Sequence, residues 1–233
     1  MNIETLTYAL LGGILPALVW LLFWLREDRK NPEPNNLILK TFLLGMISVI
    51  LVLPFQKGVE MITPSLGALA ILLWAILEEV FKLGAGYFGG LHSKEDNEPI
   101  DPIIYMITAA LGFVALENTL FIMGPLLGED VARTVITGNL RFIGASLLHV
   151  VASGFVGVAF ALVFYKSRHA RILAVTAALA AAIFFHALFN MLIIRLGSSG
   201  TTLAFVAVWI GAAGLLLAFE KAKTIAPKNN PGL

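Results

Sequence analysis

The chain has 233 residues, of which 58% are hydrophobic and only 13% charged, and its mean hydropathy of +0.87 is far above that of a soluble globular protein. The net charge of +1 gives no electrostatic reason to expect nucleic-acid binding, and the absence of cysteine excludes thiol nucleophiles, disulfides and thiolate metal sites. The composition therefore predicts an integral membrane protein whose main surroundings are the lipid bilayer.

A helix of about 20 apolar residues is long enough to cross about 30 Å of hydrocarbon. Seven such segments are expected, at about Leu6 to Leu25, Leu37 to Phe55, Pro64 to Phe88, Pro102 to Met123, Arg141 to Tyr165, Arg171 to Ile194 and Thr201 to Phe219. The predicted fold class is all-α, a polytopic helical membrane protein of about seven transmembrane helices with a buried polar site. We expect a single domain over residues 1–233, with a motif-bearing core at about 64–195.

Lys and Arg are distributed unevenly between the two ends of these predicted spans. The richer end carries Arg26, Arg29, Lys30, Lys40, Lys94, Lys166, Arg168, Arg171, Lys221, Lys223 and Lys228, and the other end carries Lys57, Arg133, Arg141 and Arg195. Short cytoplasmic loops hold the excess of basic residues in membrane proteins. We therefore predict a multi-pass protein of the cell membrane with its N-terminus outside and its C-terminus in the cytoplasm.

Four of the predicted spans carry charged or strongly polar residues at membrane depth. These residues are Glu78, Glu79 and Lys82 on the third span, Glu117 and Asn118 on the fourth, His149 on the fifth, and His186 and Asn190 on the sixth. An ionisable side chain in hydrocarbon costs at least a few kcal/mol, so residues of this kind on separate spans predict a shared, protein-lined pocket. Each alone could serve packing, but together they indicate the functional site.

The third span contains two acids and one base within five residues. Lys82 lies four residues after Glu78 and three after Glu79, so either carboxylate can reach its ammonium group. The acid left without this local partner is suited to general acid or base catalysis, because burial favours its protonated form. Glu78 has the better spacing to Lys82, which makes Glu79 the preferred base.

The residue types exclude two protease mechanisms and leave a third open. No His-Glu-x-x-His string is present, which excludes the metalloprotease helix that carries this motif. Every Asp lies in a loop or at the edge of a span, which excludes an aspartyl dyad within the membrane. A serine mechanism using Ser146 or Ser153 with a histidine is formally allowed, although the glycine context of an exposed nucleophile is poor.

The ordered set of motifs, Glu-Glu-x-x-Lys, Glu-Asn, an isolated mid-span His and His-x-x-x-Asn, resembles the PrsW family of intramembrane proteases, which is related to the CAAX prenyl protease and bacteriocin-processing superfamily. The resemblance covers about Leu72 to Asn190. It implies that Glu78 and Glu79 are the paired glutamates of the family, that His149 and His186 are its histidines, and that Asn190 helps to stabilise an oxyanion. Phe121 departs from related sequences, where an aromatic residue with a hydroxyl is expected.

The resemblance implies an endopeptidase that cuts a membrane-anchored protein, such as an anti-sigma factor, near or within the outer half of the bilayer. In one scheme a glutamate activates water and no cofactor is required; Lys82, Glu117 and Asn118 support the site. In the variant scheme Zn²⁺ is bound by His149, His186 and a glutamate, Glu79 or Glu117. A proton-coupled small-solute transporter and a non-catalytic immunity or assembly protein are the alternatives. The oligomeric state is not predicted.

Overall fold

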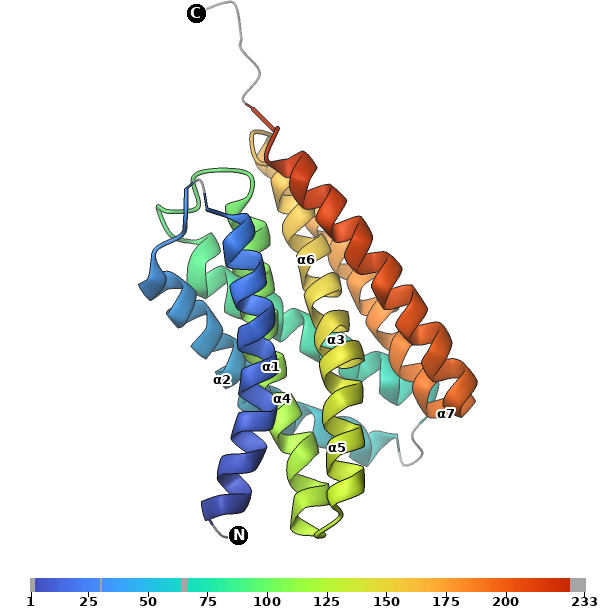
Figure 1. Ribbon diagram of the computed structural model, residues 1–233. Helices are drawn as coiled ribbons and strands as arrows, with labels where there is room; N and C mark the ends of the chain where they lie inside the picture. The colour runs from blue at the N-terminus through green and yellow to red at the C-terminus, as the bar shows by residue number, and fades with distance from the viewer. Residues whose placement is uncertain (1–2, 30, 64–66, 227–233) are drawn as a thin grey trace, which may run out of the picture.

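The computed structural model describes residues 3–29, 31–63 and 67–226, and every regular element within them is a helix. The helices are α1 (Ile3–Glu27), α2 (Asn35–Ile62), α3 (Ala68–Gly86), α4 (Asp101–Leu127), α5 (Val131–Leu140), α6 (Ser146–Leu162) and α7 (Arg168–Ala222), as Figure 1 shows. Two π-helical turns, at Tyr87–Leu91 and Arg141–Ala145, follow α3 and join α5 to α6. The all-α prediction is confirmed.

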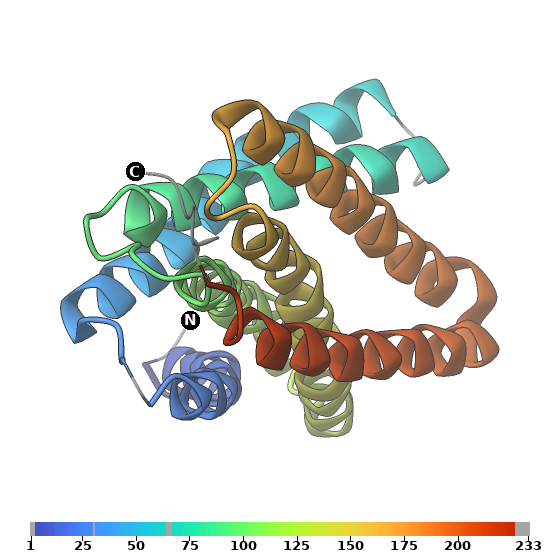
Figure 2. The same ribbon diagram turned by 90° about the horizontal axis from the view of Figure 1, so that it is seen from above.

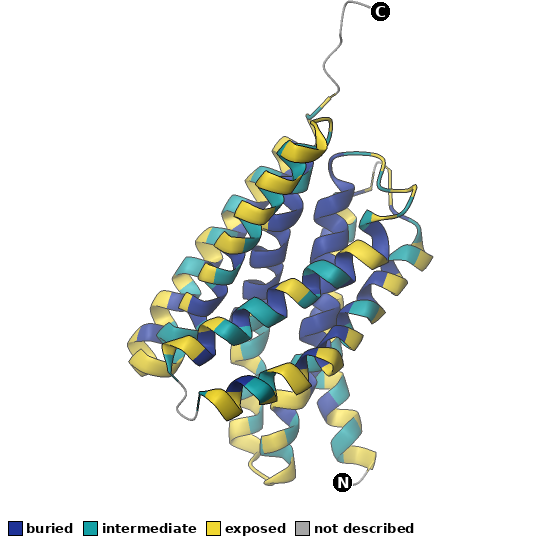
Figure 3. Cartoon of the chain, turned by 180° about the vertical axis from the view of Figure 1, so that it is seen from behind, coloured by how far each residue is buried: buried dark blue, intermediate teal, exposed yellow. Residues whose placement is uncertain are grey.

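Helix α4 forms the centre of the molecule and packs against α1, α2 and α6. Residues 101–115 are all buried, which is the environment expected for a helix that is apolar on every side. Figure 3 shows this buried interior and the exposed outer faces of the surrounding helices. A Cβ atom at Gly112 would overlap the Phe42 carbonyl oxygen, and one at Gly45 would overlap that of Ala109. Glycine at these positions therefore allows α2 and α4 to approach closely.

Five helices in the described residues are long and apolar enough to cross a membrane, whereas about seven transmembrane helices were expected. The fifth predicted span begins ten residues earlier than Arg141, because α5 and α6 run together over residues 131–162. The last two predicted spans belong to one element, α7. Helix α3 lies outside the five and carries three charged residues; the predicted start of its span, Pro64, lies outside the described residues.

Helix α7 is broken at Gly197, where the backbone has φ of 56° and ψ of −133°. An L-residue with a side chain rarely adopts this conformation, whereas glycine does so without steric cost. The two arms of α7 meet at this turn and diverge away from it, as the view from above shows (Figure 2). α7 packs against α6 and α3.

Asp28 follows α1 in the loop at the opposite end of the molecule from the Gly197 turn, and its side chain is buried. Burial raises the pKa of its carboxyl from 3.8 to about 7, and the negative charges of Asp101 and Glu98 add to this rise. The folded protein therefore holds a proton on Asp28 that the unfolded chain releases at lower pH. This difference stabilises the folded state below about pH 4, and the stabilisation is lost as the pH rises through about 7.

We expect the melting temperature of the purified protein in detergent to fall as the pH rises from about 4 to about 8, because the raised pKa of Asp28 contributes to this fall together with those of Asp96 and Asp101. Asp28→Asn should flatten this part of the profile, because an amide does not titrate. Thermal unfolding at a series of pH values checks this, with Glu95→Gln as the matched control at an exposed loop position. A D28N profile identical to the wild type would contradict the assignment.

Candidate active site

A cavity of about 1000 Å³ lies between α2, α3, α4, the α5–α6 segment and both arms of α7. Five of the residues singled out in the sequence line it: Glu78, Glu117, His149, His186 and Asn190. They come from four different helices, and the predicted convergence of polar residues on one pocket is therefore what the structure contains. Ser146 and Ser153 are not among the lining residues of this cavity in the described chain, so the geometry does not favour a serine nucleophile.

The two histidines lie side by side, and both line the cavity. Their ring centroids are 4.9 Å apart and the rings are almost perpendicular, at 87°. Both side chains are 2% exposed, and the ring of Phe113 lies 5.5 Å from that of His149 on another side. His149 lies on α6 and His186 on the first arm of α7, and these two helices pack against each other. The imidazoles are thus held in fixed orientations by packing.

Glu79 and Lys82 form a buried hydrogen-bonded group behind the histidines. Glu79 Oε1 lies 2.5 Å from Lys82 Nζ and 2.7 Å from His186 Nδ1, and Lys82 Nζ lies 2.7 Å from His149 Nδ1. The expected pairing of Lys82 with Glu78 is wrong, because the ammonium lies on Glu79, three residues away, rather than on Glu78, four residues away. The Glu79–Lys82 pair therefore fixes one ring nitrogen of each histidine.

Glu78 faces the cavity and has a different set of neighbours. Its Oε1 accepts a hydrogen bond of 2.9 Å from Gln56 Nε2, and its Oε2 lies 3.6 Å from His186 Nε2. Oε2 is buried and has no hydrogen-bond partner among the described residues. A buried carboxylate oxygen without a donor is costly unless it binds a proton, a water molecule or a cation. Glu78, rather than Glu79, thus has the oxygen available for chemistry.

Gln56 is a member of the site that the sequence analysis missed. It lies one residue beyond the predicted end of the second span, where a polar side chain is ordinary. The helix continues to Ile62, and the Gln56 backbone carbonyl also accepts a hydrogen bond of 3.3 Å from Trp74 Nε1. These two bonds tie α2 to α3 at the position of Glu78.

Arg141 is the second residue that the sequence analysis missed, since it was read as the first residue of a span. It forms an ion pair with Glu117, and its Nε donates to Asn118 Oδ1 at 2.5 Å. Glu117 Oε2 lies 3.3 Å from His149 Nε2. The guanidinium also lies 3.9 Å from the ring centroid of Phe121, a cation–π arrangement that needs no hydroxyl on the aromatic ring. Glu117 is therefore held by Arg141 at the cavity wall.

Asn118 points away from the reacting groups. Its Nδ2 donates to Ser146 Oγ at 3.1 Å, and its Oδ1 is bound by Arg141. The side chain is 1% exposed and links α4 to the beginning of α6. These contacts connect Asn118 to Arg141 and to the start of α6, and the supporting role expected from the sequence stays a prediction.

Glu78, His149 and His186 form a group that fits a metal ion. Each offers one ligand atom, and these atoms lie within 4.8 Å of one another. Glu78 Oε2 has no donor among the described residues, and the contact of His186 Nδ1 with Glu79 leaves its Nε2 directed toward Glu78. Histidine ligands of metals are commonly oriented by a carboxylate in this way. The set differs from the one expected from the sequence, because its carboxylate is Glu78 rather than Glu79 or Glu117.

Comparison with known proteins identifies the family. The profile described as "PrsW family intramembrane metalloprotease" matches residues 33–217, which is most of the chain and contains every residue of the site. The chain belongs to the PrsW family. This membership and the long apolar helices make it a multi-pass membrane protein. The family resemblance expected from the motifs is confirmed, and the relation to the wider CAAX prenyl protease superfamily stays a prediction.

Curated relatives carry the name Protease PrsW. The chain is 32% identical to the one from Geobacillus kaustophilus over 127 residues, which cover 54% of this chain and 56% of the relative. It is 26% identical to the one from Bacillus subtilis over 150 residues, covering 64% and 67%, and 31% identical to the one from Clostridioides difficile over 121 residues, covering 47% and 48%. The chain thus spans about half to two thirds of the length of these relatives. No solved structure matches it.

Proposed function

We propose that this protein is an intramembrane endopeptidase that cuts a membrane-anchored protein in the cavity between α2, α3 and α7. The observation that carries the proposal is the buried Glu78 carboxylate, whose Oε2 lacks a donor among the described residues and lies beside the two histidines. Family membership favours this activity over the proton-coupled transporter and the non-catalytic membrane protein that the same residue types allow.

Glu78 acts as the general base in this scheme. It takes a proton from a water molecule as the oxygen attacks the scissile carbonyl carbon, and it passes the proton to the leaving amine nitrogen when the peptide bond breaks. Gln56 holds the other carboxylate oxygen, so that Oε2 keeps its direction toward the cavity. The geometry thus supports Glu78 over Glu79, against the preference expected from spacing alone.

Glu79 and Lys82 position the histidines. The His186 Nδ1–H donates to Glu79 Oε1, which leaves Nε2 of the neutral ring as an acceptor facing Glu78 and the attacking water. Lys82 donates to His149 Nδ1, so the neutral His149 ring carries its proton on Nε2. His149 Nε2 lies 3.3 Å from Glu117 Oε2, so this tautomer makes His149 a donor toward Glu117 at the cavity wall.

Asn190 is the proposed donor to the oxyanion that develops on the scissile carbonyl. Its side chain lines the cavity one helical turn after His186, on the same face of α7. One donor of this kind can contribute roughly 3 to 4 kcal/mol to transition-state stabilisation. The amide needs no change of charge to act.

Zn²⁺ fits the group formed by Glu78, His149 and His186. A cation held there would supply a Lewis acid that polarises the scissile carbonyl and makes bound water more acidic. In this variant Nε2 of His149 would bind the cation and could not carry a proton, so the tautomer of His149 would differ. Glu79 would still orient His186, and Asn190 would still line the cavity.

The substrate class and the side of the cut follow from the proposed topology. The cavity lies toward the end of the bundle that holds the Gly197 turn, and the Lys and Arg bias assigns this end to the outside. A single-span protein such as an anti-sigma factor, cut in the outer half of the bilayer or just outside it, is the proposed substrate.

We expect purified protein in liposomes to cut a single-span reporter on the extracytoplasmic side of its helix. Mass spectrometry of the two products identifies the new termini, and liposomes with the Glu78→Gln variant serve as the control for contaminating proteases. A product cut on the cytoplasmic side of the reporter helix would contradict the proposed orientation. If a panel of single-span reporters, beginning with anti-sigma factors, is tested and none is cut, the proposed activity is contradicted.

A further inference from the structure

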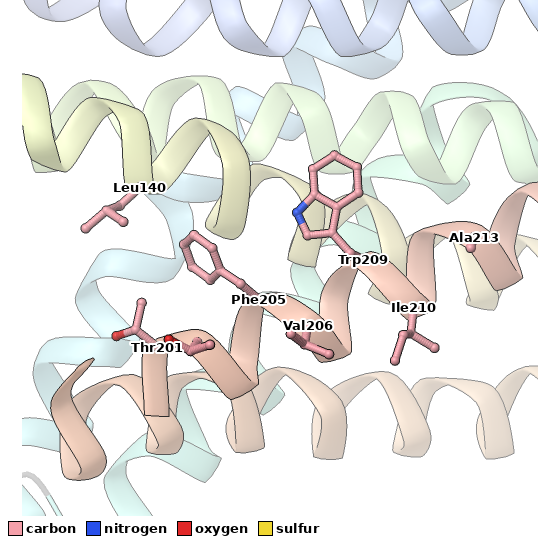
Figure 4. A pocket seen from close by; sticks show the side chains of 8 residues that line it. Leu140, Thr201, Phe205, Val206, Trp209, Ile210 and Ala213 are labelled. Carbon is pink, nitrogen blue, oxygen red and sulfur yellow. The ribbon is translucent and has the colours of Figure 1, made fainter. Parts of the chain in front are cut away.

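An apolar groove runs along the outer surface of the second arm of α7, beside the end of α5. Its floor is formed mainly by residues of the segment 201–213 that recur at intervals of one turn, together with Leu140 of α5. Figure 4 shows Phe205 and Trp209 pointing from α7 toward the helix that carries Leu140. The segment rises about 18 Å, which is more than half the thickness of the hydrocarbon core.

The groove is continuous with the catalytic cavity. Leu140, Thr201 and Phe205 line both. Phe205 stacks on Phe189 of the first arm of α7, with ring centroids 6.3 Å apart and planes 5° apart. It also lies against Gly144, where a Cβ atom would overlap the ring. Phe205 therefore marks the point at which the membrane-facing groove enters the cavity.

The groove presents an apolar surface with one polar atom in its middle. The hydroxyls of Thr201 and Thr202 donate to the carbonyls of Gly197 and Ser198, so these residues expose their methyl groups. Trp209 is 49% exposed and lies midway along the arm, away from both membrane interfaces where tryptophan is usually enriched. An indole N–H that faces acyl chains has no acceptor. A polypeptide supplies acceptors, whereas lipid tails do not.

We propose that this groove is the docking site for the transmembrane helix of the substrate, which reaches the cavity past Phe205. The inference rests on the proposed protease function, because it assigns the surface that brings a membrane-anchored chain to the catalytic residues. Exposed side chains of the groove such as Val206 and Ile210, at 53% and 68% exposure, form the apolar surface against which the substrate helix packs. Specificity for helical, membrane-spanning segments then comes from this surface.

Disulfide crosslinking tests the docking directly, because the chain contains no cysteine. Single-cysteine variants Val206→Cys and Ile210→Cys are combined with Glu78→Gln and incubated in liposomes with a single-span reporter that carries one cysteine in its helix. Copper phenanthroline and oxygen oxidise the two thiols to a disulfide. Leu203→Cys is the matched control, since Leu203 is 57% exposed on the same arm but does not line the groove.

We expect the groove cysteines to form the adduct about tenfold more than Leu203→Cys, and the yield to recur every three or four residues along the reporter helix. Equal yields at the groove and control positions, or no adduct at the groove, would overturn the docking site. Labelling of the groove cysteines by a thiol-reactive lipid with no reporter adduct would also overturn it and assign lipid as the occupant. A reporter that is crosslinked but never cut by the wild type would instead contradict the protease function.

A kinetic comparison gives a second readout. Ile210→Trp should raise the KM for the single-span reporter about tenfold, a loss of about 1.4 kcal/mol in binding, with little change in kcat. Leu203→Trp should leave both constants near the wild-type values, because it adds the same bulk outside the groove. An equal rise in KM for both variants would show a general effect of bulk on α7 and overturn the assignment.

Discussion

Glu78→Gln is expected to reduce the kcat for reporter cleavage by at least about a hundredfold, the lower end of the range for loss of a general base. The substitution keeps the shape of the side chain, and its Oε1 can still accept the hydrogen bond from Gln56. The fold should therefore be retained, which circular dichroism and the melting temperature check. Glu4→Gln, at an exposed position in the first turn of α1, is the matched control and should retain full activity.

Metal analysis of the same variants separates the two roles open to Glu78. If Glu78 is a ligand, the wild type binds about one equivalent of Zn²⁺ and E78Q loses it together with activity. If Glu78 is a base that works without a metal, chelation leaves the wild type active and E78Q is inactive all the same. Cleavage by E78Q at the wild-type rate would contradict both roles.

The site was largely predictable because charge in hydrocarbon is so costly. Glu78, Glu117, His149 and His186 could not each face lipid, so their occurrence on separate spans was enough to indicate a shared pocket. Gln56 and Arg141 carried no such signal, since polar residues at the ends of spans are ordinary in membrane proteins. Arg141 is not at the end of a span in the structure, because α5 precedes it and a π-helical turn begins at this residue.

The limits of the helices were less predictable than their positions. Hydropathy placed the fifth span at Arg141, whereas the helix begins at Val131, after Asp130 accepts a hydrogen bond of 2.9 Å from the Arg133 backbone amide. An Asp at this position is a helix N-cap signal that a hydropathy reading ignores. At Gly197 a single residue with positive φ reverses the chain, so two predicted spans form one long element with a sharp break.

The choice between Glu78 and Glu79 shows why spacing alone is insufficient. Both i, i+3 and i, i+4 pairs are within reach on a helix, and nothing in the residue order favours the shorter one. Lys82 pairs with Glu79 because His149 and His186 approach that side of α3 and supply further partners. These contacts are made between helices, so they depend on the packing of α3 against α6 and α7.

Lys82→Met is expected to be the most destabilising substitution of the set. Lys82 and Glu79 are 0% and 1% exposed, and removing one partner of a buried ion pair typically costs about 3 to 5 kcal/mol. The remaining Glu79 would keep only His186 as a partner, while His149 Nδ1 would lose its donor. Unfolding in detergent, followed by circular dichroism with increasing denaturant, measures the change in the free energy of unfolding.

Two further variants make this experiment decisive. Lys57→Met removes the lysine of another pair three residues apart, Lys57–Glu60, whose side chains are 74% and 47% exposed, and should cost less than about 1 kcal/mol. The double variant Lys82→Met with Glu79→Gln should regain most of the stability lost by Lys82→Met, because Gln carries no charge and its side-chain oxygen can still accept from His186.

Equal losses for Lys57→Met and Lys82→Met would contradict a buried, uncompensated carboxylate as the cause. A double variant less stable than Lys82→Met alone would show that Glu79 stabilises the fold through His186 even without the lysine.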